Sequence, residues 1–425
     1  MAPSTSKRHT GVSGHCSDSD PAAAQAHVTH HQRRTLASTK AMTNLHPLLA
    51  AALFLFFLSC AAAAADPVPD SCEAIRDFVD VSFCASRLRS VPGAAAADRH
   101  GHLLMAADLA AASGASARDA AAALARRVAG DDQAARRRED ALEACGILYG
   151  AASVPALRLM RGYAAARSWA TARALLPLTG QAGIGCDAAL GGSPALAGGG
   201  GEMAAANREF DQLSTMATAL LNKVAGRPAA WGVRFYGCVF RTTMAASTLM
   251  RSFLLASAAA VCAGAAGVTN TTALDTVCSF LGGYYVTPEL CTSVLCHDPT
   301  SPCRAARDGP AVAALAARLA AANATAARDS VAAAAAASTP DVETKAGLRA
   351  CLQLYTGAAA ALEWAAGSVA AGRLAGAREV LQAAQYVAAG CDGMVAGEAM
   401  PKENGGFDTM VIVAHAVVAS LSTAY

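Results

Sequence analysis

The chain has 425 residues, of which 111 are alanine, 5% are aromatic and 16% are charged. Alanine is the strongest intrinsic helix former, whereas an all-β protein would need more β-branched and aromatic residues. A disordered chain would need more charge and less than the 54% apolar content found here. The formal charge of +2 gives no electrostatic reason to expect nucleic acid as a partner. We therefore expect a helical globular protein of about two to three domains.

An apolar run at residues 48–58 precedes a stretch of small residues that ends at Asp66. This pattern is typical of a secretory signal peptide, and the run is too short for a stop-transfer helix. Because Met42 lies just before the run, we interpret residues 42–65 as the signal peptide. Residues 1–41 are then a disordered extension or an overrun of the gene model. The mature chain is expected to be secreted, without a stable membrane anchor.

Eight of the 14 cysteines recur with nearly the same spacing in two parts of the chain. The matched series are Cys72, Cys84, Cys145 and Cys186, and Cys278, Cys291, Cys351 and Cys391. Their separations are 12, 61 and 41 residues in the first series and 13, 60 and 40 in the second. We interpret the chain as a tandem duplication, with one unit at residues 66–228 and another at residues 270–425.

Each unit is predicted to contain four long helices, because apolar residues recur at intervals of three and four. The first helix carries Leu103 and Ala107 in the first unit, and Val312 and Leu315 in the second. The later helices are predicted at residues 136–163, 169–190 and 202–224, and at residues 341–371, 373–395 and 407–422. The predicted fold class is all-α, with two tandem up-down four-helix bundles. Each bundle has an N-terminal helical hairpin and two disulfides.

Secretion favours disulfides over free thiols for the repeated cysteines. Four cysteines allow three pairings, and the spacing does not choose among them. The second unit also carries Cys296 and Cys303, for which we expect an additional bridge. Zinc held by Cys296, His297 and Cys303 is the alternative, but a fourth ligand is not apparent. We predict no metal and no cofactor.

Two sequons, at Asn270 and Asn323, are compatible with glycosylation of a secreted protein. Residues 229–269 join the two units and contain an apolar run that is similar to a second signal peptide. We interpret this as a fusion of two neighbouring genes, in evolution or in the gene model. A linker helix packed on one bundle is the alternative, and the run is short for a transmembrane helix.

The repeat resembles the plant invertase and pectin methylesterase inhibitor family. The resemblance is carried by the signal peptide, the sequences around Cys145 and Cys351, and the hairpin Tyr285-Val286-Thr287-Pro288-Glu289-Leu290-Cys291. Residues 76–82 depart from the Thr and Pro that the family's hairpin carries at that point. The resemblance implies a helical hairpin on a four-helix bundle, with the first cysteine bonded to the second and the third to the fourth. It also implies an extracellular location, in the apoplast or cell wall.

By this resemblance, one bundle face covers the active cleft of a cell-wall enzyme without covalent chemistry. Pectin methylesterase and acid invertase are the candidate partners. Invertase inhibitors commonly carry Pro-Lys-Phe before the fourth cysteine, whereas here Pro401-Lys402-Glu403 follows Cys391, which favours pectin methylesterase. The candidate contact residues are Arg158, Arg161, Tyr163 and Arg167, a cationic and aromatic set that suits acidic residues of a target. An ordinary solvated face is the alternative.

We expect no enzyme activity, because the sequence lacks a nucleophile elbow. It ends soon after the second unit, so we expect no appended pectinesterase domain. His100, His102 and His415 are interpreted as structural, and Gly183 and Gly185 as a helix-ending turn. Two further alternatives are a helical carrier of lipids, which an apolar cavity for an acyl chain would favour, and a bundle that has lost inhibition.

Overall fold

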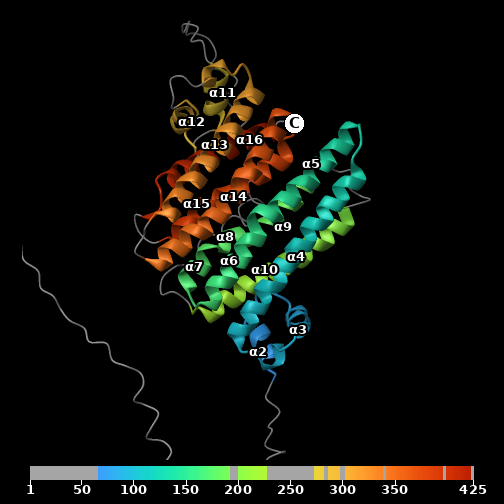
Figure 1. Ribbon diagram of the computed structural model, residues 1–425. Coiled ribbons are helices and arrows are strands. Elements are labelled where there is room, and N and C mark those ends of the chain that lie inside the picture. The colour runs from blue at the N-terminus through green and yellow to red at the C-terminus, as the bar shows by residue number, and fades with distance from the viewer. Residues whose placement is uncertain are drawn as a thin grey trace, which may run out of the picture. The chain divides into compact units, whose positions relative to one another are not determined.

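The computed structural model describes residues 66–191, 200–226, 272–281, 286–296, 302–337, 341–395 and 399–422. The predicted extension, signal peptide and inter-unit linker lie outside these residues, as do Asn270 and His297. All described residues belong to one compact unit, Asp66–Tyr425. They form helices and connecting loops with no β-strand among them, which confirms the all-α prediction (Figure 1).

The first repeat begins with a hairpin of α2 (Val68–Glu73) and α3 (Val81–Arg89), followed by the short η2 (Ala94–Ala96). The first bundle helix is α4 (Arg99–Val128). The second is α5 (Gln133–Ile147), continued by the π-helical η3 (Leu148–Ser153) and α6 (Val154–Ala165). The third consists of α7 (Trp169–Ala174), α8 (Leu176–Thr179) and α9 (Gln181–Gly191), and the fourth is α10 (Gly200–Val224).

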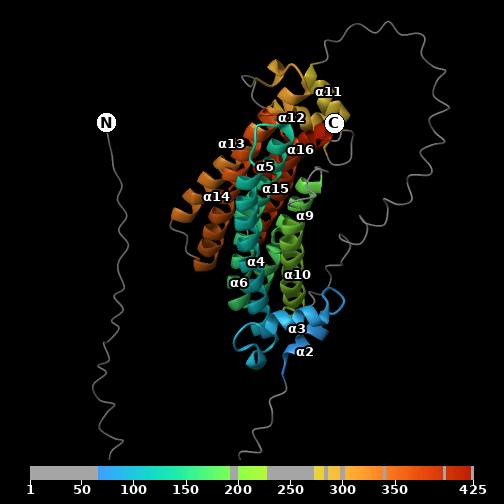
Figure 2. The same cartoon turned by 90° about the vertical axis from the view of Figure 1, so that its right-hand side faces the viewer.

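The second repeat follows the same order. Its hairpin consists of α11 (Ala273–Phe280) and α12 (Pro288–Leu295), followed by the short η5 (Pro302–Ala305). Its bundle helices are α13 (Gly309–Ala336), α14 (Val342–Ala370), α15 (Leu374–Met394) and α16 (Glu403–Ser422). Figure 2 shows each hairpin at one end of its own bundle.

The predicted helix at residues 136–163 is helical throughout but contains the π-helical η3, whereas the helix predicted at residues 169–190 is broken at Leu175 and Gly180, so the prediction of one unbroken helix there was wrong. Pro155 and Pro177 are each the second residue of a new segment, α6 and α8. Proline lacks an N–H and clashes with the carbonyl four residues earlier, which breaks the regular ladder. Counting from the matched cysteines, the second repeat has Ala361 and Gln382 at these positions, and α14 and α15 are continuous.

Aspartate and threonine side chains fix where the helices begin. Asp98 accepts a hydrogen bond of 2.8 Å from the backbone N–H of Gly101 at the start of α4. In the hairpins, Asp80 caps α3 and Thr287 caps α12, each four residues before the second cysteine of its repeat. Asp80 therefore supplies the cap that Thr287 supplies in the second hairpin, because either side-chain oxygen satisfies a free N–H of the first turn.

The disulfides staple each hairpin and join the second bundle helix to the third. The pairs are Cys72–Cys84, Cys145–Cys186, Cys278–Cys291, Cys351–Cys391 and Cys296–Cys303. The first four pairs are those that the family resemblance implies, and Cys296–Cys303 is the additional bridge expected from the sequence. The bond between Cys296 and Cys303 removes two ligands of the alternative zinc site. Elsewhere in the described part of the chain, no group of three His, Cys, Asp or Glu side chains is placed to hold a metal ion.

A buried hydrogen bond recurs at the centre of both bundles. Tyr149 Oη donates to Oδ1 of Asn207 at 2.6 Å, and the Tyr149 ring packs edge-on against Phe210 with 4.9 Å between centroids. The same contacts in the second bundle join Tyr355, Asn404 and Phe407. A buried phenol needs such a partner, since an unpaired hydroxyl in an apolar core is costly.

Gly183 and Gly185 lie inside α9, so the interpretation of a helix-ending turn was wrong. A Cβ on Gly183 would approach Oδ1 of Asp211 to 1.9 Å, and a Cβ on Gly185 would approach Leu148 Cδ1 to 2.9 Å. The two glycines therefore allow close packing of α9 against its neighbours. Among the described helices, α16 alone is long and apolar enough to cross a membrane. We interpret it as a core helix, because residues such as Phe407 are buried within the second bundle.

Two of the three histidines interpreted as structural form hydrogen bonds inside the first repeat: His102 ties the hairpin to α4, and His100 joins α4 to α6. His102 is fully buried on α4, and its ring nitrogens lie 2.8 Å from Ser71 Oγ and 2.8 Å from the carbonyl of Ala94. His100 Nε2 lies 2.9 Å from the carbonyl of Ala164. These contacts support the structural interpretation, because both side chains are occupied by hydrogen bonds within the fold.

Candidate target-binding face

The candidate residues Arg158 and Arg161 lie on the outer side of α6. The inner side of this helix is set by Leu157 and Met160, which are fully buried. Because residues one position apart point in different directions on a helix, Arg158 is left exposed and Arg161 half-buried. Nε of Arg161 lies 3.2 Å from a carboxylate oxygen of Asp108 on α4, so part of its charge is compensated within the bundle.

Arg167 lies just after α6 in a left-handed backbone conformation, with φ of 59°. The chain turns there because the N–H of Ser168 donates to the carbonyl of Tyr163 at 2.9 Å. In the second repeat the same turn is made by Gly372, with φ of 76°, and the N–H of Arg373 donates to Ser368. Such turns favour glycine. The guanidinium of Arg167 is exposed at a position where the backbone prefers a smaller residue.

Tyr163 is half-buried, and it does not extend the same open surface. The pKa of its phenol is raised, mainly by burial and to a smaller extent by the negative charge of Glu343 at the start of α14. The helix that carries Tyr163, α6, contacts α14 of the second repeat. The structure brings Arg158 and Arg161 together on one helix face, with Arg167 beyond the end of that helix and Tyr163 half-buried.

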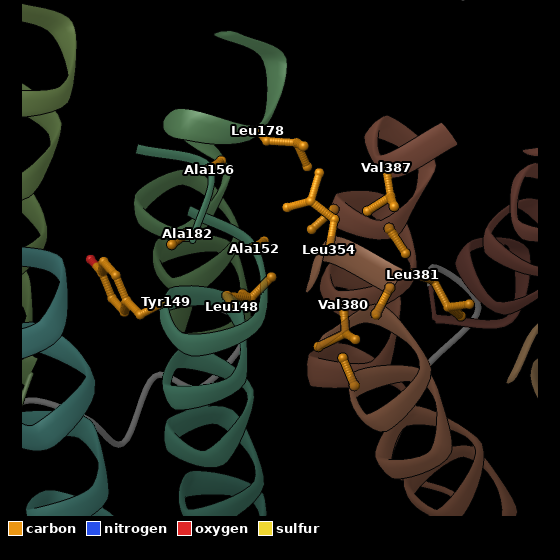
Figure 3. Packing of buried hydrophobic residues seen from close by; sticks show 14 of the residues in the cluster. Leu148, Tyr149, Ala152, Ala156, Leu178, Ala182, Leu354, Val380, Leu381 and Val387 are labelled. Atoms are coloured by element: carbon orange, nitrogen blue, oxygen red, sulfur yellow. The ribbon is translucent and has the colours of Figure 1, made fainter. Parts of the chain in front are cut away.

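The two repeats pack directly against each other through α5, η3, α6, α7, α8 and α9 of the first and α14 and α15 of the second. We call this contact the inter-repeat interface. Figure 3 shows Leu148, Ala152 and Leu178 facing Leu354, Val380 and Val387. An apolar cavity of about 20 Å³ between these surfaces has room for one water molecule at most. This part of the interface is closely packed and leaves no room for a ligand.

A polar cluster borders the apolar part of the inter-repeat interface. Asp140 on α5 is 6% exposed, and its Oδ1 accepts hydrogen bonds from Ser368 Oγ at 3.0 Å and from Arg373 Nε at 2.8 Å. Burial outweighs these two partners and raises the pKa of Asp140. Nearby, Nε1 of Trp364 donates to Glu143 at 3.1 Å. None of these residues was predicted from the sequence, because a carboxylate on a helix is usually solvated and its partner lies far away in the chain.

The second sequon was expected to be a glycosylation site. Asn323 lies within α13, half-buried, and its Nδ2 donates to the carbonyl of Leu319 at 2.9 Å. A glycan acceptor is expected on a surface loop, so this helical setting differs from the usual one.

Comparison with known proteins gives one match. The family model described as plant invertase/pectin methylesterase inhibitor matches residues 272–417, which run from the cap of α11 into the last turns of α16. Neither a curated protein nor a solved structure matches the chain. The matched part contains the hairpin, the four bundle helices and the disulfides of the second repeat. Residues 272–417 are therefore similar to plant invertase/pectin methylesterase inhibitors.

Proposed function

We propose that this protein is a secreted inhibitor of pectin methylesterase that acts in the apoplast, with acid invertase as the alternative target. The observation that carries the proposal is the family match over residues 272–417. The first repeat supports it, because its hairpin, bundle and disulfide pairing have the same order as those of the matched repeat.

The proposed mechanism is non-covalent coverage of the enzyme's active cleft. A bundle stapled by disulfides loses little conformational entropy when it docks, which favours tight binding. An interface of about 1,600 Å² is typical of such complexes. The outer face of α6 and the turn that follows it offer Arg158 and Arg167 as exposed cations. Guanidinium groups pair well with carboxylates of a target.

The inter-repeat interface limits which faces a target reaches. It covers the sides of α5 to α9 that face the second repeat and the sides of α14 and α15 that face the first. A target enzyme therefore docks on the outer sides of the bundles. The cationic set belongs to the first repeat, since the second, counted back from the shared turn at Arg167 and Gly372, has Glu363, Ala366 and Ser368 at the positions that correspond to Arg158, Arg161 and Tyr163.

The test is methanol release from pectin by a plant pectin methylesterase, titrated with oxidised protein that begins at Asp66. We expect stoichiometric inhibition. If the disulfides are intact and pectin methylesterase retains full activity, the proposal fails for this target. Sucrose hydrolysis by acid invertase then tests the alternative.

A charge-reversal pair tests the proposed face. The variant Arg158→Glu/Arg167→Glu is expected to weaken inhibition at least about tenfold, because it reverses two exposed cations. The matched control is Arg318→Glu/Arg349→Glu, which reverses two exposed arginines of the second repeat. Equal inhibition by both double variants would place the contact elsewhere while leaving the inhibitory function intact.

A further inference from the structure

An open groove of about 880 Å³ lies beside the polar cluster of the inter-repeat interface. One wall is α5 of the first repeat, and the other is the connection between α14 and α15 of the second. The ends of α13 and α16 close it with Pro310 and Leu421. Its volume lies within the range of about 300–1,000 Å³ that is common for small-molecule sites.

The groove carries excess positive charge. Arg136, Arg137 and Arg373 line it, against the single carboxylate of Asp140. Asp140 is engaged by Arg373 and Ser368, so its charge is already compensated. Arg136 and Arg137 are exposed, and neither forms an ion pair with another residue in the described part of the chain. Two guanidinium groups are therefore available to an anion, and both suit a carboxylate.

The rest of the lining is mainly aliphatic. Val369, Leu374 and Leu421 provide branched side chains, and small residues of α5, α9 and α15 provide the remaining apolar surface. The uncharged polar side chains are those of Gln133 and Ser422. A sugar chain needs a partner for each buried hydroxyl, and this groove offers few. A hydrocarbon chain needs none.

We propose that this groove binds an amphipathic carboxylate of the fatty-acid type. The carboxylate pairs with Arg136 and Arg137, and the hydrocarbon chain lies along Val369, Leu374 and Leu421. The site uses residues of both repeats and none of the candidate contact residues on α6. It is therefore a second binding function, separate from inhibition of an enzyme.

The test measures binding of dodecanoate, below its micelle-forming concentration, to oxidised protein that begins at Asp66. Titration calorimetry is expected to show saturable binding in the micromolar range. The methyl ester keeps the chain and loses the charge, so it should bind at least about tenfold more weakly. The variant Arg136→Gln/Arg137→Gln should lose affinity to a similar extent, with unchanged helical content by circular dichroism.

The matched control is Arg318→Gln/Arg349→Gln, which removes two exposed arginines outside the groove and should bind dodecanoate like the parent. Absence of saturable binding to the folded parent would overturn the proposal. So would equal affinity of the two double variants, since the carboxylate would not then depend on Arg136 and Arg137. Tighter binding of trigalacturonate than of dodecanoate would overturn it in favour of a uronate site.

Discussion

Nε of Arg373 donates a 2.8 Å hydrogen bond to Asp140, a residue 233 positions earlier in the chain. Asp140 belongs to α5 of the first repeat, and Arg373 precedes α15 of the second. The carboxylate is 6% exposed, so most of its hydration is lost in the folded protein. A buried carboxylate requires such compensation. The hydrogen bond therefore couples the stability of one repeat to the presence of the other.

Replacement of Arg373 by alanine is expected to destabilise the protein by about 1–2 kcal/mol, because Asp140 keeps only its hydrogen bond from Ser368. The guanidinium is itself 39% exposed, and solvent screening keeps the loss moderate. Urea unfolding of the oxidised protein measures the effect. Arg318→Ala, on the exposed side of α13, is the control and should change stability by less than about 0.5 kcal/mol. An equal change in both variants would contradict the coupling.

Gly376 on α15 lies where the two repeats approach each other closely. A Cβ at this position would lie 2.8 Å from Ala144 Cβ and 3.1 Å from the Trp364 ring. Gly376→Ala is therefore expected to cost about 1–3 kcal/mol through overpacking. Gly367→Ala is the matched control, because its Cβ would meet nothing within 4 Å and helix propensity favours alanine. The melting temperature of Gly367→Ala should lie above that of the parent, and that of Gly376→Ala below it. The reverse order would show that the interface has room for a Cβ at Gly376.

Asp211 should make stability depend on pH. Its pKa is raised from 3.8 to about 6, mainly by burial and to a smaller extent by the negative charge of Asp187. The folded protein thus binds this proton more tightly than the unfolded chain. The resulting stability is fully present below about pH 4 and is lost as pH rises through about 6. Asp211→Asn removes this dependence, so the variant should gain stability relative to the parent between these values, by at most about 3 kcal/mol.

Guanidinium unfolding of both proteins from pH 4 to pH 7 measures this difference. Asn has the shape of Asp, so it keeps the close packing against Gly183. Asp408 in the second repeat has a pKa raised by burial and by Asp392, and Asp408→Asn should show the same sign. If the difference in stability between Asp211→Asn and the parent stays constant across this pH range, titration of Asp211 does not contribute to the pH dependence of stability.

Arg167→Gly is expected to stabilise the protein by about 0.5–1 kcal/mol, because a left-handed backbone is costly for a residue with a Cβ. The reciprocal variant is Gly372→Ala, at the same turn of the second repeat. Its Cβ would meet no atom within 4 Å, so the backbone conformation alone sets the loss. Chemical denaturation should give opposite signs for the two substitutions. If both substitutions lower the stability, the side chain of Arg167 stabilises the fold through its contacts.

Much of the local structure was predictable from the sequence. Apolar periodicity predicted most of the helices, and cysteine spacing predicted the same order of hairpin and bundle in both halves of the described chain. The features of local structure that the sequence did not predict lie where two sequence patterns disagree. Pro155 and Pro177 lie within otherwise regular helical patterns, and a π-helical segment or a short break accommodates each of them. Gly183 and Gly185 looked like a turn, although close packing explains glycine inside α9 equally well.

The candidate site was only partly predictable. Arg158 and Arg161 share a helix face by their spacing alone. The ion pair of Arg161 with Asp108 and the approach of Glu343 to Tyr163 depend on which helices are neighbours. Periodicity indicates that one side of a helix is covered, but it does not identify the covering surface.

The sequence by itself determined the helical class, the order of elements within each repeat and the cysteines available for bonding, because these follow from local propensity and spacing. The tertiary structure decided how the repeats pack, through Asp140 with Arg373 and Leu148 near Val380. It also decided that a groove lined by Arg136 and Arg137 forms beside that contact. These features depend on surfaces that are more than 200 residues apart in the chain, and their complementarity is a property of the folded shape.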